Sequence, residues 1–126
     1  MSCCVYSINI AVSLRLLFYT SVKVRLVDGD ASSGRVEVLY DGDWGTVCDD
    51  EWDLDDGNVV CRQLGFRDAI AVYTNSHFGG GSGNILLDEV NCTGSESRIS
   101  DCSHDGWGVE DCIDEFEAAG VECGGK

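Results

Sequence analysis

Several residue types that enzymes depend on are scarce in this sequence. Only two of the 126 residues are histidine, His77 and His104, and no Gly-x-Ser-x-Gly motif presents a nucleophilic serine. Asp105 follows His104, but neighbours in sequence rarely point at each other usefully, so we interpret His104 as a loop residue. The sequence therefore predicts no catalytic site and no enzyme activity.

Basic residues are also scarce after the first 27 positions. From Asp28 onward the sequence has five basic residues against 23 acidic ones, a net charge of −18. Such a surface repels nucleic acid, anionic lipid and other polyanions unless cations intervene, which argues against a nucleic-acid-binding protein. It suits a divalent cation or a basic partner, although most of these carboxylates need no role beyond solubility.

Long apolar runs are missing as well. No stretch of about 20 uninterrupted apolar residues is present, which argues against a helix that spans a membrane. Residues 1–21 differ from the rest, since they hold no acid, one base (Arg15) and mostly apolar or small residues. We interpret them, with Cys3 and Cys4, as a leader or a degenerate signal-like segment. One domain is predicted over residues 22–123, followed by a tail at 124–126.

Cysteine, by contrast, is abundant. Six cysteines lie from Cys48 to Cys123, without the CxxC pairs that are typical of zinc sites. An even number spread over loop-rich sequence indicates three disulfides in an oxidising, extracellular compartment, because six reduced thiols are too many for so small a core. Six cysteines allow 15 pairings, so the spacing leaves the connectivity open. One local pair is a reasonable guess: Cys92 and Cys102 could close a short disulfide loop.

The pattern of apolar residues predicts an α+β fold. Apolar and polar residues alternate over 22–26, 36–40 and 44–47, as in half-buried strands, and residues 41–43 (Asp-Gly-Asp) mark a tight turn. The periodicity becomes helical over 53–64, where Asp55 or Asp56 is the expected cap and Gly65 ends the helix. Short strands are expected at 69–73, 85–87 and 120–123. The result is a small domain with one helix against a curved sheet.

Two glycine-containing segments resemble ligand sites without fitting them. Residues 79–83 look like a phosphate-binding loop, but they lead into a predicted strand rather than a helix, so we interpret them as a bend. Residues 53–57 resemble the start of an EF-hand. However, the glycine comes one residue early, and Leu64 stands where the calcium-binding Glu belongs. Helix capping is the better interpretation of this segment.

Three polar motifs remain. Asn91-Cys92-Thr93 is an N-glycosylation sequon, which predicts a glycan on Asn91. Residues 49–51 (Asp-Asp-Glu) follow Cys48, and residues 88–89 (Asp-Glu) follow a predicted strand. Carboxylates held in this way are able to bind a hard cation, which takes six to eight oxygen ligands in the case of calcium. On spacing alone, solvated loop charges are the simpler interpretation.

Several motifs follow one another in an order that is itself informative. They are residues 24–27 (VRLV), 34–38 (GRVEV), 44–52 (WGTVCDDEW), 59–66 (VVCRQLGF), 78–83 (FGGGSG), 87–92 (LDEVNC), 106–108 (GWG) and 119–123 (AGVEC). In this order the chain resembles a scavenger receptor cysteine-rich (SRCR) domain over about residues 22–123. Because the domain holds six cysteines, it is similar to the six-cysteine subgroup, group A.

The resemblance implies a small disulfide-rich α+β fold in which a curved antiparallel sheet cradles one main α-helix. It also implies a disulfide pairing and two calcium or magnesium sites. The implied disulfides are Cys48–Cys112, Cys61–Cys123 and Cys92–Cys102. The first implied metal site consists of Asp49, Asp50 and Glu117. The second consists of Asp88, Glu89 and Asp111.

The chain departs from the family pattern at both implied sites. Before Glu117 there is one extra residue, and Ala118 stands where Asp is usual, so Asp114 or Glu115 competes with Glu117 as a ligand. At the second site Glu89 and Asp111 replace the usual Asp and Asn, which keeps oxygen ligands. Clustered basic residues, which some members use to hold polyanions, are nearly missing.

The resulting hypothesis is an extracellular ligand-recognition module of scavenger-receptor type, secreted or part of the ectodomain of a membrane protein. It would bind an extracellular protein or a polyanionic or microbial ligand with the help of Ca²⁺ or Mg²⁺, without nucleic acid and without inserting into a membrane. One alternative is a metal-independent interaction module for a basic partner. Another is an accessory domain of a larger protein, such as a multidomain receptor, a lysyl oxidase-like enzyme or a serine protease.

Overall fold

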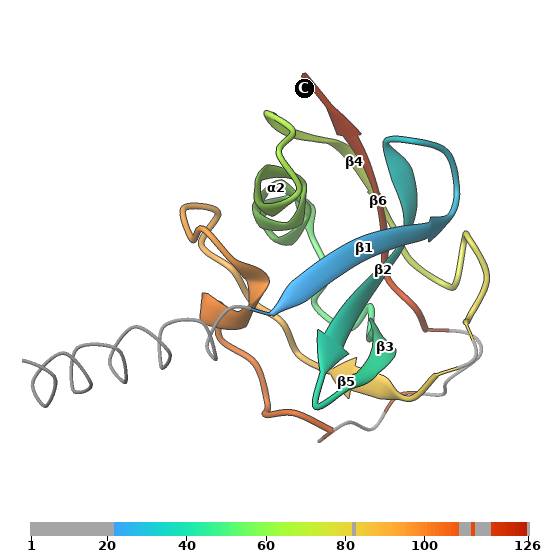
Figure 1. Cartoon of the computed structure of the whole chain (residues 1–126). Coiled ribbons are helices and arrows are strands. Elements are labelled where there is room, and N and C mark those ends of the chain that lie inside the picture. Colours follow the sequence, from blue (N-terminus) through green and yellow to red (C-terminus); the bar gives the residue numbers. More distant parts are fainter. Residues whose placement is uncertain (1–21, 82, 109–111, 113–116, 126) are drawn as a thin grey trace, which may run out of the picture.

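Six strands, one α-helix and a short 3₁₀-helix make up the fold in the computed structural model, which describes residues 22–81, 83–108, 112 and 117–125 (Figure 1). The predicted leader at residues 1–21 lies outside the described residues. The elements are β1 (Lys23–Asp28), β2 (Ser33–Tyr40), β3 (Asp43–Val47), α2 (Leu54–Gln63), β4 (Asp68–Tyr73), β5 (Ile85–Leu87), the 3₁₀-helix η1 (Ile99–Asp101) and β6 (Gly120–Gly124).

The strands form one curled, mixed sheet. Its order is β4-β6-β2-β3-β5, and β1 pairs with β2 beside this path. All pairs are antiparallel except β3–β5, which is parallel, so the sheet is not the wholly antiparallel one that the family resemblance implies. Because β3 and β5 run in the same direction, the residues that follow Val47 and Leu87 leave the sheet at the same edge.

Helix α2 packs on one side of this sheet, and its first turn is closed by a capping box. The side chain of Asp53 accepts from the Asp56 N–H at 3.2 Å, and the Asp56 carboxylate accepts from the Asp53 N–H at 2.7 Å. The prediction of Asp55 or Asp56 as the cap is therefore wrong. A capping residue must be extended, as Asp53 is at φ −137°, whereas Asp55 and Asp56 already belong to the helix.

The core lies between α2 and the sheet. Helix residues Val59, Val60 and Cys61 are fully buried, as expected for the apolar face of a helix. Gly57 also faces the sheet, where a Cβ atom would lie 2.5 Å from Cγ1 of Val72. The remaining apolar core is supplied mainly by the strands and the loops that follow them: Val36, Val38, Val47, Trp52, Leu87, Val90, Ile99, Ala119 and Val121.

Three disulfides tie distant parts of this core together. Cys61–Cys123 joins α2 to β6, and Cys48–Cys112 joins the end of β3 to the C-terminal part of the chain. Cys92–Cys102 closes the short loop that carries η1. These are the pairs that the family resemblance implies. No helix in the described part of the chain is long and apolar enough to cross a membrane.

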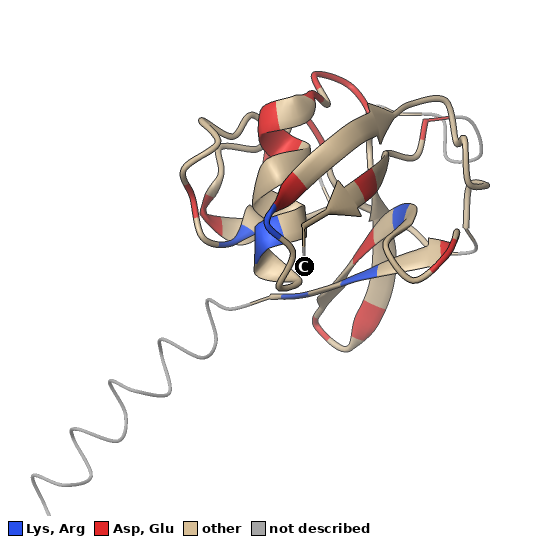
Figure 2. Ribbon diagram, turned by 90° about the horizontal axis from the view of Figure 1, so that it is seen from above, with Lys and Arg blue, Asp and Glu red and all other residues tan. Residues whose placement is uncertain are grey.

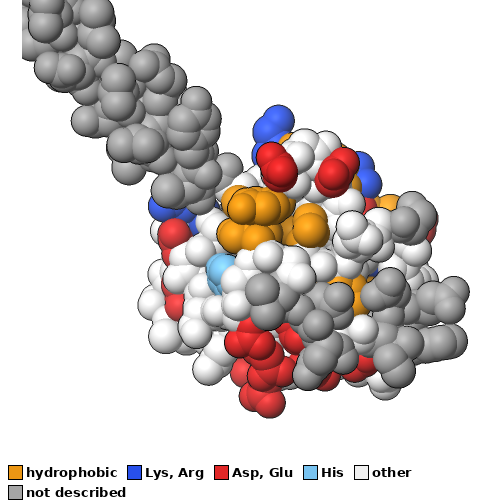
Figure 3. Space-filling view, turned by 90° about the horizontal axis from the view of Figure 1, so that it is seen from below, with side chains coloured by type: hydrophobic (Ala, Val, Ile, Leu, Met, Phe, Trp, Pro, Cys, Tyr) orange, Lys and Arg blue, Asp and Glu red, His pale blue; other side chains and the backbone are white. Residues whose placement is uncertain are grey.

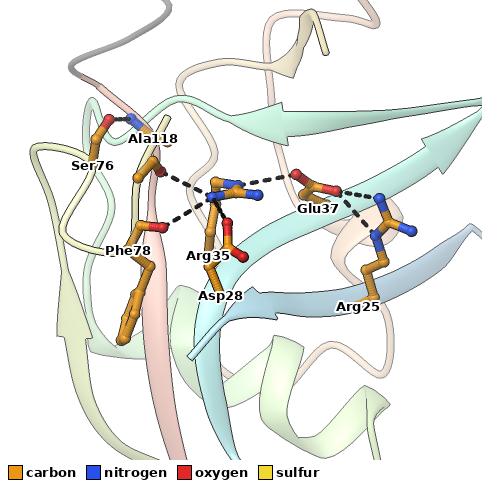
Figure 4. A network of polar contacts seen from close by, with 8 residues as sticks. Arg25, Asp28, Arg35, Glu37, Ser76, Phe78 and Ala118 are labelled. Atoms are coloured by element: carbon orange, nitrogen blue, oxygen red, sulfur yellow. Dashed lines mark hydrogen bonds and ion pairs between the residues drawn. The ribbon is translucent and has the colours of Figure 1, made fainter. Parts of the chain in front are cut away.

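A buried polar network supports the glycine-rich loop that precedes β5 (Figure 4). The Arg35 guanidinium donates to the backbone carbonyls of Phe78 and Gly79 and to the carboxylates of Glu37 and Asp28. Gly81, at φ +75°, lies so close that a Cβ atom would be 3.0 Å from Arg35 Nε. The loop is thus a bend around a buried arginine, in agreement with its interpretation from the sequence.

Candidate functional site

Two acidic segments meet at the edge of the sheet where β3 and β5 end. The Cys48 N–H donates to the Leu87 carbonyl at 2.8 Å, so the chains that leave both strands start side by side. Asp50 follows β3 by three positions, and Asp88 and Glu89 follow β5 directly. Acidic side chains are gathered on the face seen from below in Figure 3, and acidic positions are spread over much of the ribbon in Figure 2.

The carboxylates of Asp50, Asp88 and Glu89 form one compact group. One oxygen of each lies within 4.8 Å of the others. Asp50 belongs to a second such group, in which its carboxylate meets that of Glu117 beside the sulfurs of Cys48 and Cys112. These two sulfurs are joined in a disulfide and hold no thiolate, so only the carboxylates are suitable ligands. Their hard oxygens fit calcium or magnesium rather than a thiophilic metal.

The grouping differs from the two sites that the resemblance implies. Asp50 contributes to both groups and stands between Glu117 on one side and Asp88 and Glu89 on the other. Asp49 belongs to neither group, and its carboxylate accepts from the Asn75 N–H at 2.6 Å. Asp111, Asp114 and Glu115 lie outside the described residues.

The surroundings of this acidic group disfavour further negative charge. Asp88 is 1% exposed, and its Oδ1 accepts from the Glu89 N–H at 2.7 Å. Desolvation, followed by repulsion from Asp88 and Asp105, raises the pKa of Glu89 above its ordinary value. A raised carboxyl pKa means that the surroundings destabilise the ionised carboxylate. A divalent cation bound nearby would offset that destabilisation.

Comparison with known proteins agrees with this fold and cysteine arrangement. The sequence profile of the scavenger receptor cysteine-rich domain matches residues 27–124. The chain belongs to the scavenger receptor cysteine-rich family. The mouse (Mus musculus) macrophage scavenger receptor types I and II is 52% identical over 101 residues, which cover 79% of this chain and 22% of that protein. The chain thus spans less than a quarter of the length of this relative.

Two solved structures confirm the α+β fold. The SRCR domain of mouse MARCO, crystallised in a dimeric form, is 48% identical and superposes with a TM-score of 0.68 over 79% of this chain and 93% of that one. The third SRCR domain of murine neurotrypsin is 44% identical and superposes with a TM-score of 0.75 over 82% and 96%. The family prediction made from the motifs is therefore confirmed.

In this SRCR domain, sequence analysis missed a cluster of basic residues. Lys23 on β1, Arg62 at the end of α2 and Arg98 before η1 line one pocket of about 540 Å³, together with Trp44. They make up half of the six Lys and Arg residues in the described part of the chain. Because they come from three separate elements, no local run of charge reveals them, and the expectation that clustered basic residues are nearly missing needs correction.

The two histidines of the SRCR domain serve as packing residues. The His77 ring stacks on Tyr73, with ring centroids 4.3 Å apart. His104 Nδ1 accepts from the Gly106 N–H at 2.9 Å, and desolvation lowers the pKa of His104. Its ring packs edge-on against Trp107. His104 is thus held by its loop, as its sequence position suggests.

Proposed function

We propose that this SRCR domain is an extracellular recognition module that binds anionic ligands, such as polyanions or microbial surface polymers, with the help of Ca²⁺ or Mg²⁺. The observation that carries the proposal lies where the parallel strands β3 and β5 end: the Asp50 carboxylate meets those of Asp88 and Glu89 in one group and that of Glu117 in another. Four carboxylates from distant parts of the chain supply the hard oxygen ligands that these cations prefer.

The cation would be held by Asp50 together with Asp88 and Glu89, or with Glu117. When bound, it would neutralise part of the acidic surface and offer coordination positions to anionic groups of a ligand. The chain's own role is to hold the carboxylates close together. Their backbone is fixed by the Cys48 N–H bond to Leu87 and by the Asp49 N–H bond to the Glu117 carbonyl, both 2.8 Å long.

The basic pocket supports the anionic class of ligand. Lys23, Arg62 and Arg98 provide a local positive surface on a domain whose described acidic residues far outnumber its basic ones. Arg62 and Arg98 are partly engaged, since they donate to the Gly94 carbonyl and to the Asp101 carboxylate. A polyanion long enough to reach both regions would meet the cation and the basic pocket together, which would strengthen binding through multivalency.

Calorimetric titration of the oxidised protein with CaCl₂ and MgCl₂ tests the cation, and heparin binding with and without EDTA tests its role. We expect a dissociation constant of about 10⁻⁴ to 10⁻³ M for calcium, as in other extracellular modules. Asp50→Asn should weaken calcium binding by about tenfold or more. Asp68→Asn, at an exposed position on β4, should leave it unchanged. Absence of heat up to about 10 mM calcium, well above that range, would contradict the cation site. Heparin binding that EDTA does not change would contradict its role in recognition.

We further infer that the chain is a non-catalytic module of the six-cysteine subgroup. Its three disulfides support that subgroup and an oxidising, extracellular compartment. The short span that it covers in its macrophage receptor relative supports a place within a larger protein. Mass mapping of disulfide-linked peptides from secreted protein would test the pairing.

We also propose that Asn91 carries a glycan. Asn91 and Thr93 are exposed, which leaves the sequon accessible. Cys92 between them is buried in a disulfide, so we expect partial occupancy. Protein secreted from mammalian cells should lose mass on treatment with peptide N-glycosidase, and Thr93→Ala should remove that loss. Equal masses before and after treatment would contradict the proposal.

A further inference from the structure

A second pocket, of about 460 Å³, opens beside the turn that joins β2 to β3. The turn and β5 lie at the bottom of Figure 1, and Figure 3, which views the molecule from below, shows hydrophobic side chains gathered on this face. The pocket combines aromatic and acidic residues. It is lined by Tyr40, Asp41, Asp43, Trp44, Gly83, Asn84 and Leu86.

The two carboxylates of this aromatic–acidic pocket are placed by the geometry of the turn. Tyr40 pairs with Asp43, so Asp41 and Gly42 form a two-residue hairpin loop. Both have positive φ, 54° and 88°, as the mirror-image turns that suit hairpins require. The turn therefore carries an exposed carboxylate on each side of Gly42.

Glycines allow the two sides of the pocket to approach each other. A Cβ atom on Gly83 would lie 2.5 Å from the Trp44 carbonyl oxygen, and one on Gly45 would lie 2.4 Å from the Asn84 carbonyl oxygen. Side chains at either position would push the segment before β5 away from β3. The close approach fixes Trp44 and Leu86 as neighbours around the opening.

The aromatic wall is held in place before any ligand arrives. Tyr40 is 40% exposed, and its ring stacks on Trp107 with centroids 4.2 Å apart and planes 3° apart. The Gly108 N–H donates to the Leu86 carbonyl at 2.9 Å, which anchors the Trp107 segment to β5. A rigid aromatic surface loses little conformational entropy when a partner packs on it.

This domain already shows how such a surface holds a guanidinium group. Cζ of Arg25 lies 4.1 Å from the centroid of the Trp44 ring, while its Nη2 donates to the Glu37 carboxylate at 2.6 Å. An aromatic ring and a carboxylate thus act together on one cation. Trp44 also lines the aromatic–acidic pocket, where the ring of Tyr40 and the carboxylates of Asp41 and Asp43 offer the same two kinds of group to a cation from outside.

We propose that the aromatic–acidic pocket binds an arginine or lysine side chain of a partner protein, without a metal ion. Among the described residues that line it, none is Lys or Arg, and two are carboxylates, so its charge is complementary to a cationic group. The site differs from the group of Asp50, Asp88 and Glu89 and does not rest on cation binding there. It gives the metal-independent, basic-partner alternative a definite location.

A titration followed by ¹H–¹⁵N correlation spectra in the presence of EDTA tests this site. The probe is an end-blocked peptide of alternating glycine and arginine, and its control has citrulline, the neutral isostere, in place of arginine. We expect the arginine peptide to shift the amide signals of residues 41–43 and 84–86 more than those of Asp50 and Asp88. The citrulline peptide should bind at least about tenfold more weakly, a difference of about 1.4 kcal/mol.

Paired variants separate this pocket from the general acidity of the domain. Asp41→Asn with Asp43→Asn should weaken binding of the arginine peptide about tenfold. Asp55→Asn with Asp68→Asn, which removes two exposed charges elsewhere, should change it less than about twofold. Tyr40→Phe should retain binding, and Tyr40→Leu should reduce it, since an aromatic face is needed.

Four results would overturn the proposal. Equal binding of the citrulline peptide would show that positive charge is not recognised, and an equal loss in both double variants would show binding by net charge alone. Shifts confined to Asp50 and Asp88 would place the peptide at the other acidic group. Concentration-dependent dimerisation in sedimentation, lost on Tyr40→Leu, would show that a second copy of this chain occupies the pocket.

Discussion

Arg35 and Glu37 form an ion pair in the interior of the domain, with 3.0 Å between the guanidinium Nε and the carboxylate Oε2. Only 5% and 6% of their side-chain surfaces are exposed. They stand two positions apart on β2, so strand alternation places both on the same face. Glu37 also accepts two hydrogen bonds from Arg25, and one carboxylate therefore holds two arginines (Figure 4).

Replacing Arg35 should be costly because it would leave Glu37 buried with one partner fewer. We expect Arg35→Met to lower the free energy of unfolding by about 3–5 kcal/mol, measured by urea denaturation. Arg98→Met is the control, since Arg98 forms an exposed pair with Asp101 that should contribute about 1 kcal/mol or less. Similar losses in the two variants would show that burial does not determine the strength of the network.

Replacing Gly57 with alanine, a change that usually stabilises a helix, should destabilise this domain. Alanine at an interior helix position gains about 1 kcal/mol over glycine in helix propensity, but the added methyl group would meet Val72 at 2.5 Å. We expect Gly57→Ala to lower stability by about 1–3 kcal/mol through overpacking. In a double-mutant cycle, Val72→Ala should remove part of that loss. Additive effects would contradict direct contact between α2 and β4 at this point.

Asp56 should make stability fall with rising pH. Burial raises the pKa of Asp56 to about 7 from an ordinary 3.8, although the N–H groups of Cys92 and Asp53 favour its ionised form. Between these two values the folded state keeps a proton that the unfolded state releases, so the stabilisation present below pH 3.8 is lost as the pH approaches 7.

Urea unfolding at pH 5 and pH 8 measures this effect. The wild type should lose more stability between the two conditions than Asp56→Asn, in which the titrating group is gone. Asp55→Asn, at the exposed neighbouring position, should behave like the wild type. If the Asp56→Asn variant loses as much stability as the wild type, the carboxyl group is ionised in the fold.

Substitutions of the neighbouring residues Asp49 and Asp50 should have different effects on calcium binding and on stability. Asp50→Asn should weaken calcium binding by about tenfold or more, because Asp50 belongs to both carboxylate groups. Asp49→Asn should affect calcium less and lower stability by about 1 kcal/mol through its bond to the Asn75 N–H. Calorimetry and urea denaturation on the same two variants distinguish these effects. The opposite ranking for calcium would place the cation beside Asp49.

Local pattern was enough to predict the elements but not their partners. Alternation and periodicity located all six strands and the helix to within three residues, because burial of one face imposes them locally. The parallel pairing of β3 with β5 depends on contacts between segments about 40 positions apart, which no local signal contains. The cap at Asp53 was missed because three nearby aspartates suit that role by composition, and only the backbone angle distinguishes them.

For the candidate sites too, the sequence indicates the individual residues but not which of them lie together. Neighbouring carboxylates such as Asp88 and Glu89 are visible as a motif, but their meeting with Asp50 depends on the strand pairing. The pocket of Lys23, Arg62 and Arg98 and the stacking of Tyr40 on Trp107 join residues at least 36 positions apart. Sequence reasoning therefore identifies which residues have suitable chemistry, and the fold decides which of them act together.

The place of β6 between β4 and β2 has a consequence for the order in which the sheet can form. Among the described residues β4 pairs with β6 alone, and β6 in turn pairs with β2, so β6 joins β4 to the rest of the sheet. It also carries Cys123, the partner of Cys61. β4 therefore cannot join the sheet until residues 120–124 have been synthesised, and Cys61 cannot form its disulfide with Cys123 before then.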